Sequence, residues 1–217
     1  MRIVIDLQGF QGSNQQRGIG RYTLSLAQAI ARNRGSHEVF IALNGMFPDT
    51  IETIRFAFEG LLPEENIRVW RSLEPVNNLD ESNDWRRRSA EFIREAFLAS
   101  LKPDIVLVSS VFEGLGDNVV TSIGALSSSI PTAAVLYDLI PLIQRSPYLD
   151  NPIVEVWYEK KLSHLRKADM LLAISESSRQ EGLQYLGFCN YILSCLTPKT
   201  YLVTKSFLFK TFSHNWF

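Results

Sequence analysis

The chain has 217 residues, of which 46% are hydrophobic, and a formal net charge of -1. This length suits one large domain or two small ones with a substantial core. The near-neutral charge supplies no overall attraction to nucleic acid or anionic lipid, so no nucleic-acid partner is expected and any basic site must be local.

Nothing in the sequence calls for a metal or an organic cofactor. The three histidines lie in separate predicted elements, Cys189 and Cys195 have no metal-ligand spacing, and no D-x-D motif occurs. No uncharged apolar run is long enough to cross a bilayer. A cytoplasmic protein is expected, with at most a peripheral contact at the inner membrane.

The first stretch, from Arg2 to Gly9, predicts a buried strand, because an apolar run without alternation suits the centre of a parallel sheet. A loop containing Gly18 and Gly20 then leads into a helix, at the edge where open α/β sheets bind ligands. Glycines there leave the N–H groups of a helix start uncovered, and these groups attract an anion such as phosphate. A tight turn that binds nothing is an equally weighted alternative, because no P-loop or complete dinucleotide fingerprint is present.

Further strands and helices follow in alternation. Strands are predicted at 38–43, 67–70, 105–108, 131–136 and 170–174, and helices at 19–32, 48–60, 85–101, 152–165 and 176–186. This alternation favours an α/β fold with a doubly wound, Rossmann-like parallel sheet.

The helix at 85–101 carries Arg86, Arg87, Arg88 and Arg94 beside aromatic residues. A solvated helix face is the more common meaning of such a run of charges. The alternative is a basic, aromatic-edged helix that rests on anionic lipid headgroups.

Four blocks of the sequence resemble a known family: Arg2–Gln8, Arg17–Tyr22, Tyr137–Leu142 and Ala168–Ser178. In this order they resemble the N-terminal half of bacterial retaining glycosyltransferases of the two-domain GT-B architecture, and most closely the family 4 mannosyl- or rhamnosyltransferase-like enzymes of surface-polysaccharide synthesis. The resemblance implies a nucleotide-diphosphate sugar as donor and a glycan or lipid-linked acceptor.

The resemblance also implies roles for the glycine loop. Gly18 and Gly20 would offer backbone N–H groups to the donor diphosphate, and Arg17 or Arg21 would neutralise its charge. Such contacts act on the transition state, because the leaving nucleoside diphosphate gains charge as its bond to the sugar breaks.

Two candidate catalytic residues, Tyr137 and Asp138, follow the strand at 131–136. Many relatives carry a histidine at the position of Tyr137, where it contacts the donor sugar. A tyrosine can still hydrogen-bond a hydroxyl, although it can equally pack under a loop at the strand end. Asp138 can bind a sugar hydroxyl or cap a turn before Pro141.

The resemblance covers residues 1–187, which predicts an acceptor-side domain there and an atypical tail at 188–217. That tail has few acidic residues and no clear periodicity, so out-of-frame reading or disorder is expected. Nothing after Gly187 resembles the family's donor-binding domain. The chain is therefore expected to be inactive alone unless a partner chain supplies the donor half.

Two other functions remain open at this stage. One is a free-standing module that binds nucleotide or phosphate, and the other is a non-catalytic remnant.

Overall fold

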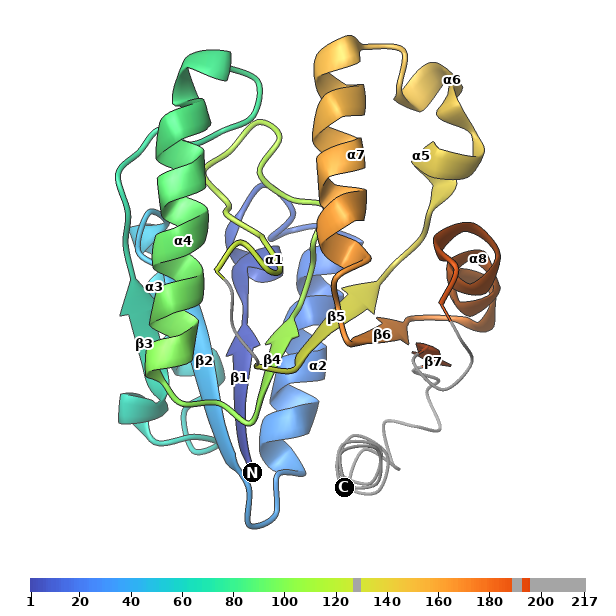
Figure 1. The fold of residues 1–217 in the computed structure, drawn as a ribbon. Coiled ribbons are helices and arrows are strands. Elements are labelled where there is room, and N and C mark those ends of the chain that lie inside the picture. Colours follow the sequence, from blue (N-terminus) through green and yellow to red (C-terminus); the bar gives the residue numbers. More distant parts are fainter. Residues whose placement is uncertain (127–129, 189–192, 196–217) are drawn as a thin grey trace.

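The computed structural model describes residues 1–126, 130–188 and 193–195. At its centre is a parallel sheet in the order β3-β2-β1-β4-β5-β6-β7 (Figure 1). The strands are β1 (Arg2–Asp6), β2 (Glu38–Asn44), β3 (Ile67–Trp70), β4 (Ile105–Val108), β5 (Thr132–Leu136), β6 (Met170–Ala173) and β7 (Leu193–Cys195). The doubly wound, Rossmann-like parallel sheet is confirmed, and all six predicted strands are present.

Helices cover both faces of the sheet (Figure 1). One face packs against α2 (Gly18–Arg32) and α3 (Pro48–Ala57), and the other against α4 (Asp84–Ser100), α7 (Pro152–Leu165) and α8 (Glu176–Leu186). Successive residues of β1 enter opposite cores, with Ile3 and Ile5 on the α2 side and Val4 on the α4 side. Both faces of a central strand are thus buried, which explains its unbroken apolar sequence. The shorter helices are α1 (Gln8–Gln11), α5 (Ile140–Ile143), α6 (Arg145–Tyr148), η1 (Glu64–Asn66) and η2 (Glu81–Asn83).

The predicted bounds of α7 and α8 are confirmed, whereas α3 ends at Ala57, three residues before its predicted end. The side chain of Asn151 accepts a hydrogen bond from the Ile153 amide at the start of α7, and Ser175 accepts one from the Ser178 amide at the start of α8. Gly187 ends α8 in the left-handed conformation, with φ of 72°. These local signals set where each helix begins and ends.

The solvated-face interpretation of the arginine run was wrong at one position. Arg94 is 1% exposed and lies under the sheet's carboxyl edge, where its Nε donates to Asp6 Oδ2 at 2.8 Å and its Nη2 pairs with the same oxygen. Its Nη1 also donates to the Ser122 carbonyl at 2.9 Å. Asp6 is itself 1% exposed, so the two charges compensate one another away from water.

A long connection joins β4 to β5, and its described part (109–126 and 130–131) contains no helix or strand. Buried polar contacts hold it in place. The Glu95 carboxylate accepts from Ser122 Oγ at 2.6 Å and from the Leu126 amide at 2.6 Å. Lys161 Nζ donates to the Thr121 carbonyl at 2.8 Å and to its hydroxyl at 2.7 Å. Side chains of α4 and α7 therefore hold this connection in place, since its described part has no helix or strand of its own.

Most of the predicted tail lies outside the described residues. Of residues 188–217, the structure describes Phe188 and the backbone of β7, which pairs with β6 in parallel. Within the described ranges, no helix has the length and apolarity needed to cross a bilayer.

The Asp6–Arg94 pair is expected to be a major contributor to stability. We predict that Asp6→Asn lowers the free energy of unfolding by about 3–5 kcal/mol, because it leaves the Arg94 guanidinium buried without its counter-charge. Urea unfolding would measure this. The matched control is Glu52→Gln, which breaks an exposed pair with Arg55 and should cost less than about 1 kcal/mol. Equal costs for the two variants would contradict the prediction.

Burial lowers the pKa of Lys161 to about 7, against a smaller opposing effect of Glu91. In the unfolded chain this lysine stays protonated up to about pH 10. Between pH 7 and 10 the unfolded state therefore binds more protons than the native state, so native stability rises with pH in this window.

We predict that the unfolding free energy of the unmodified chain, minus that of Lys161→Met, is flat below pH 7 and rises above it by at most about 1.4 kcal/mol per pH unit. Urea unfolding of both proteins from pH 6 to 10 would measure the difference. A difference that is level across this range would show that Lys161 keeps its ordinary pKa.

Candidate functional site

The sheet's order reverses between β1 and β4, because β1 pairs with β2 on one side and with β4 on the other. Ligands of open α/β sheets bind outside the carboxyl ends of the strands at this reversal. Three loops meet there: the glycine loop (residues 12–17) between α1 and α2, the β4–β5 connection and the segment that follows β5. Their side chains and backbone groups form the candidate site.

The glycine loop ends where α2 begins, at Gly18. Arg17 precedes the helix in an extended conformation, and its carbonyl accepts the first helical hydrogen bond, from Arg21 N at 3.1 Å. Among the described residues, the amides of Gly18, Ile19 and Gly20 donate no backbone hydrogen bond, and Gly18 is exposed whereas Gly20 is buried. These amides are the ones to which a phosphate at a helix start binds.

Gly18 and Gly20 have different surroundings. A Cβ atom built on Gly18 would meet nothing within 4 Å, whereas one built on Gly20 would lie 2.3 Å from the Asn14 carbonyl oxygen and 2.6 Å from that of Gln15. Gly20 is therefore needed so that the glycine loop can fold back over the first turn of α2. Gly18 has no such packing role, and it is exposed.

The two candidate arginines flank this helix start. Arg17 and Arg21 are both exposed, and Arg21 Nη2 donates to the Gln16 carbonyl at 3.2 Å. Their cationic groups lie on the same loop and first helical turn as the amides that they were predicted to assist.

Tyr137 lies against the first turns of α2. Its hydroxyl is 2.9 Å from Thr23 Oγ1 and donates to the Ser109 carbonyl at 3.2 Å and, more weakly, to the Ile19 carbonyl at 3.5 Å. Its ring meets that of Tyr22 edge to face, with centroids 5.6 Å apart. Tyr137 thus joins the end of β5 to α2 and to the end of β4.

Asp138 follows directly and is exposed. Its Oδ1 accepts from the Ile140 amide at 3.1 Å, which is the turn-capping contact predicted before Pro141. The carboxylate also faces water beside Tyr137, so the capping contact leaves the sugar-binding alternative open.

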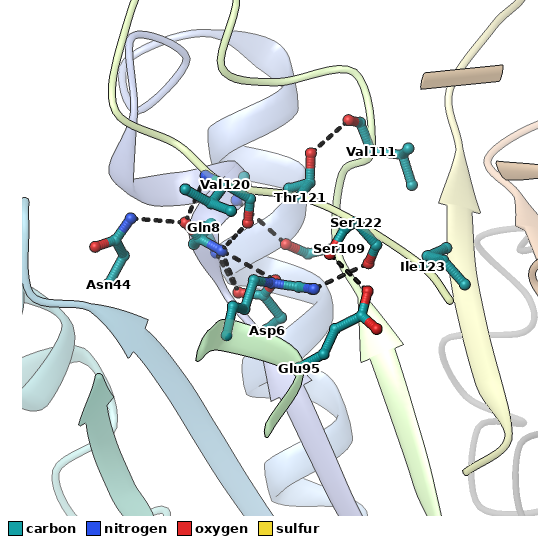
Figure 2. A network of polar contacts seen from close by, with 12 residues as sticks. Asp6, Gln8, Asn44, Glu95, Ser109, Val111, Val120, Thr121, Ser122 and Ile123 are labelled. Carbon is teal, nitrogen blue, oxygen red and sulfur yellow. Dashed lines mark hydrogen bonds and ion pairs between the residues drawn. The ribbon is translucent and has the colours of Figure 1, made fainter. Parts of the chain in front are cut away.

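A buried polar network supports the base of the site (Figure 2). The side chain of Gln8 donates to both Asp6 carboxylate oxygens at 3.2 Å and to the Val120 carbonyl at 2.6 Å, and it accepts from the Val120 amide and from Asn44 Nδ2. One glutamine thus joins the ends of β1 and β2 to the β4–β5 connection.

Sequence reasoning did not identify Glu113, which lies at this edge and is 3% exposed. Burial raises its pKa to about 7, while hydrogen bonds from Ser110 and Asn14 oppose the rise. The available signal was a pair of acidic residues, Glu113 and Asp117, in a glycine-containing loop that follows a buried strand. Within the described residues, no group of three His, Cys, Asp or Glu side chains is arranged to hold a metal.

A groove of about 650 Å³ runs between α4 and α7. Its walls are largely apolar, with Phe92 and Val156 exposed at 50% and 71%, and the Lys160–Glu91 ion pair also lines it. None of the residues predicted for the donor site lines this groove, so the two are separate features of the surface.

No protein-family model matches the chain. It is 38% identical over 186 residues to a serotype-specific mannosyltransferase WbdA of Escherichia coli, a match that covers 85% of this chain and 22% of that protein. A second WbdA mannosyltransferase of Escherichia coli is 36% identical over 161 residues, covering 74% of this chain and 20% of the relative.

Among solved structures, a spinosyn rhamnosyltransferase, SpnG, matches 80% of this chain and 45% of its own with a TM-score of 0.36 and 13% identity. That similarity is too distant to support a conclusion about activity. Over most of its length the chain is thus similar to one segment of bacterial mannosyltransferases, and it spans about a fifth of the length of these curated relatives.

Proposed function

We propose that the chain supplies the acceptor-side part of a glycosyltransferase that transfers a sugar from a nucleotide-diphosphate donor in polysaccharide synthesis. The observation that carries this proposal is the 38% identity with a mannosyltransferase over 85% of the chain. The doubly wound sheet and the four sequence blocks agree with an N-terminal half of the GT-B, family 4 type. In such an enzyme the sugar is transferred with retention of its configuration.

The start of α2, with Arg17 before it, would act on the leaving group. As the bond to the sugar breaks, negative charge grows on the diphosphate, and the exposed start of α2 at Gly18 can receive it. The sequence predicted the same role for the Gly20 amide, but Gly20 is buried beside the carbonyl groups of Asn14 and Gln15. Arg17 and Arg21 are exposed beside this helix start and would add positive charge. Because the charge is largest in the transition state, these groups would accelerate transfer rather than only bind the donor.

Tyr137 and Asp138 would meet the sugar. The hydroxyl of Tyr137 contacts Thr23 and Ser109 and so joins the end of β5 to α2 and to the end of β4. We propose that these contacts fix the part of the site in which the sugar lies. The exposed carboxylate of Asp138 would accept a hydrogen bond from a sugar hydroxyl. Neither role calls for a metal ion.

The remaining donor contacts would come from residues outside this sequence, either further along the same protein or on a partner chain. We therefore propose that residues 1–187 act as one domain that is inactive by itself. The alternatives are a free-standing phosphate-binding module and a non-catalytic remnant. Tight binding of a sugar diphosphate by the isolated monomer would favour the module, and no diphosphate binding at all would favour the remnant.

The exposed apolar residues of α4 suit a lipid-linked acceptor. Trp85 and Phe92 are 57% and 50% exposed, and the Arg88 side chain is 70% exposed on the same helix. Aromatic residues beside a cation are typical of contact with an anionic membrane surface. We propose a peripheral contact of this helix with the inner membrane.

The membrane contact predicts that the chain co-sediments with vesicles of phosphatidylglycerol and that the Trp85→Ser/Phe92→Ser variant co-sediments about fivefold less. Exposed Phe56, on α3 at the opposite face, provides the matched control Phe56→Ser. Equal binding by the two variants would exclude α4 as the contact.

Because Gly18 has open space around it, a side chain there tests the amide site without disturbing the fold. We predict that Gly18→Asp weakens binding of a nucleoside diphosphate about five- to tenfold, since its carboxylate repels the phosphates at the helix start. Stability should not fall, because an acidic residue in the first helical turn is favourable. Calorimetric titration and thermal unfolding measure the two effects.

The matched control is Gly18→Ala, which adds a side chain without charge and should bind like the unmodified chain. If Gly18→Asp binds the diphosphate as well as Gly18→Ala does, the diphosphate does not lie at this helix start. The proposed role of the glycine loop would then be wrong.

A further inference from the structure

We infer that Glu113 is a positioning residue that holds the glycine loop in its site-forming conformation, with Asp117 as a second anchor. This inference rests on the proposed function, since it concerns how the loop of that same site is kept in shape. It assigns a task to two carboxylates of the β4–β5 connection.

The contacts run from the β4–β5 connection to the glycine loop. Asn14 Nδ2 donates to Glu113 Oε2 at 2.8 Å and to Oε1 at 3.0 Å, and Ser110 Oγ donates to Oε1 at 2.8 Å. The Ser13 amide donates to Asp117 Oδ2 at 2.9 Å. Two adjacent residues of the loop are thus bound by two carboxylates about a hundred residues away in the chain.

Asn14 is the residue on which the rest of the loop depends. Its carbonyl accepts from the Arg17 amide at 2.9 Å, and the same carbonyl closely approaches Gly20. The position of Asn14 therefore sets the position of Arg17 and the way in which the loop covers the first turn of α2. A carboxyl group that holds the Asn14 side chain controls the helix start indirectly, without touching a ligand.

Burial and the neighbouring polar groups together set the pKa of Glu113, with burial raising it most and the hydrogen bonds from Ser110 and Asn14 lowering it. Asp117, from the same connection, raises the pKa of Glu113, while Lys161, from α7, lowers it, and Asn14 and Ser110 donate hydrogen bonds from the glycine loop and the end of β4. Burial has the largest effect and raises the pKa of Glu113 to about 7.

In an opened loop the Glu113 carboxyl would return to water and to its ordinary pKa near 4.5. Between pH 4.5 and 7 the closed loop therefore keeps a proton that the open loop loses. Opening becomes easier as pH rises through this window and does not change further above it. For a pKa of about 7, the open fraction is about tenfold smaller at pH 6 than at pH 8.

The experiment is amide hydrogen exchange of residues 12–17 at pH 6 and pH 8, corrected for the intrinsic exchange rate at each pH. In the unmodified chain we expect exchange to be about tenfold slower at pH 6. Glu113→Gln, which resembles the protonated acid, should remove this pH dependence. Glu113→Ala should expose the loop at both pH values, with exchange at least about tenfold faster than in the unmodified chain at pH 6.

Two further variants distinguish the contact between Glu113 and Asn14, called the clamp below, from a general loosening of the β4–β5 connection. Glu95→Gln weakens a carboxylate that holds another part of the same connection, at Ser122 and Leu126, and should keep the tenfold pH dependence. Asp117→Asn leaves the Glu113 contact in place and weakens the acceptor of the Ser13 amide, so exchange should accelerate more at Ser13 than at the other residues of the loop. If Glu113→Ala does not fold, Glu113→Gln and Asp117→Asn still decide the question.

Binding of inorganic pyrophosphate connects the clamp to the site. We expect Glu113→Ala to weaken it about tenfold and Glu113→Gln to restore it. Exchange in Glu113→Ala as slow as in the unmodified chain at pH 6, or a tenfold pH dependence kept by Glu113→Gln, would show that Glu113 does not hold the loop. Altered exchange with unaltered pyrophosphate affinity would show that the held conformation does not form the site, which would also overturn the inference. If the unmodified chain and Gly18→Ala bind no pyrophosphate, the proposed function fails, while exchange alone still decides whether Glu113 holds the loop.

Discussion

The carboxyl edge of the sheet depends on the buried ion pair between Asp6 and Arg94. A guanidinium with 1% exposure can be tolerated only beside a carboxylate and carbonyl groups that replace its water. The hydrogen bonds of the Arg94 guanidinium join the middle of α4 to Asp6 at the end of β1 and to the Ser122 carbonyl of the β4–β5 connection. Gln8 then extends the same contacts to Val120 and Asn44.

This arrangement determines what the candidate site can be. The β4–β5 connection has no helix or strand in its described part, and side chains of α1, α4 and α7 hold its shape. Glu113 and Asp117 lie on that connection, and through it the glycine loop is coupled to the interior of the protein. The glycine loop is therefore held both by its own backbone hydrogen bonds and by the carboxylates of Glu113 and Asp117.

Hydrophobic periodicity and helix-terminal residues were enough to predict the six principal strands and the five long helices. Such patterns are local, because Asn151, Ser175 and Gly187 act within a few residues of their own positions. The partners of Arg94 and Glu113 were not predictable in the same way. Arg94 lies 88 residues from Asp6 in the sequence, and Glu113 lies 99 residues from Asn14. In a charge run such as Arg86–Arg88 and Arg94, the sequence alone does not show which cation has a buried carboxylate opposite it.

Of the candidate site residues, Tyr137 lies beside the start of α2, whereas the hydrogen bond of Asp138 is with the Ile140 amide. Tyr137 reaches Thr23 and Ile19 because β5 and β1 both end at the same edge as β4. Its hydroxyl contacts were not predictable, because they depend on the exact approach of α2 to the strand ends. The same holds for the carbonyl groups that crowd Gly20.

The two glycines at the helix start, with only Ile19 between them, differ in how much space surrounds them. Any side chain at position 20 would push the loop away from α2, so the fold itself requires glycine there whether or not the protein binds a ligand. Position 18 has room for a side chain, and the conformation of its backbone does not forbid one. Evolution would keep a glycine at position 18 only if something other than the fold must come close to it.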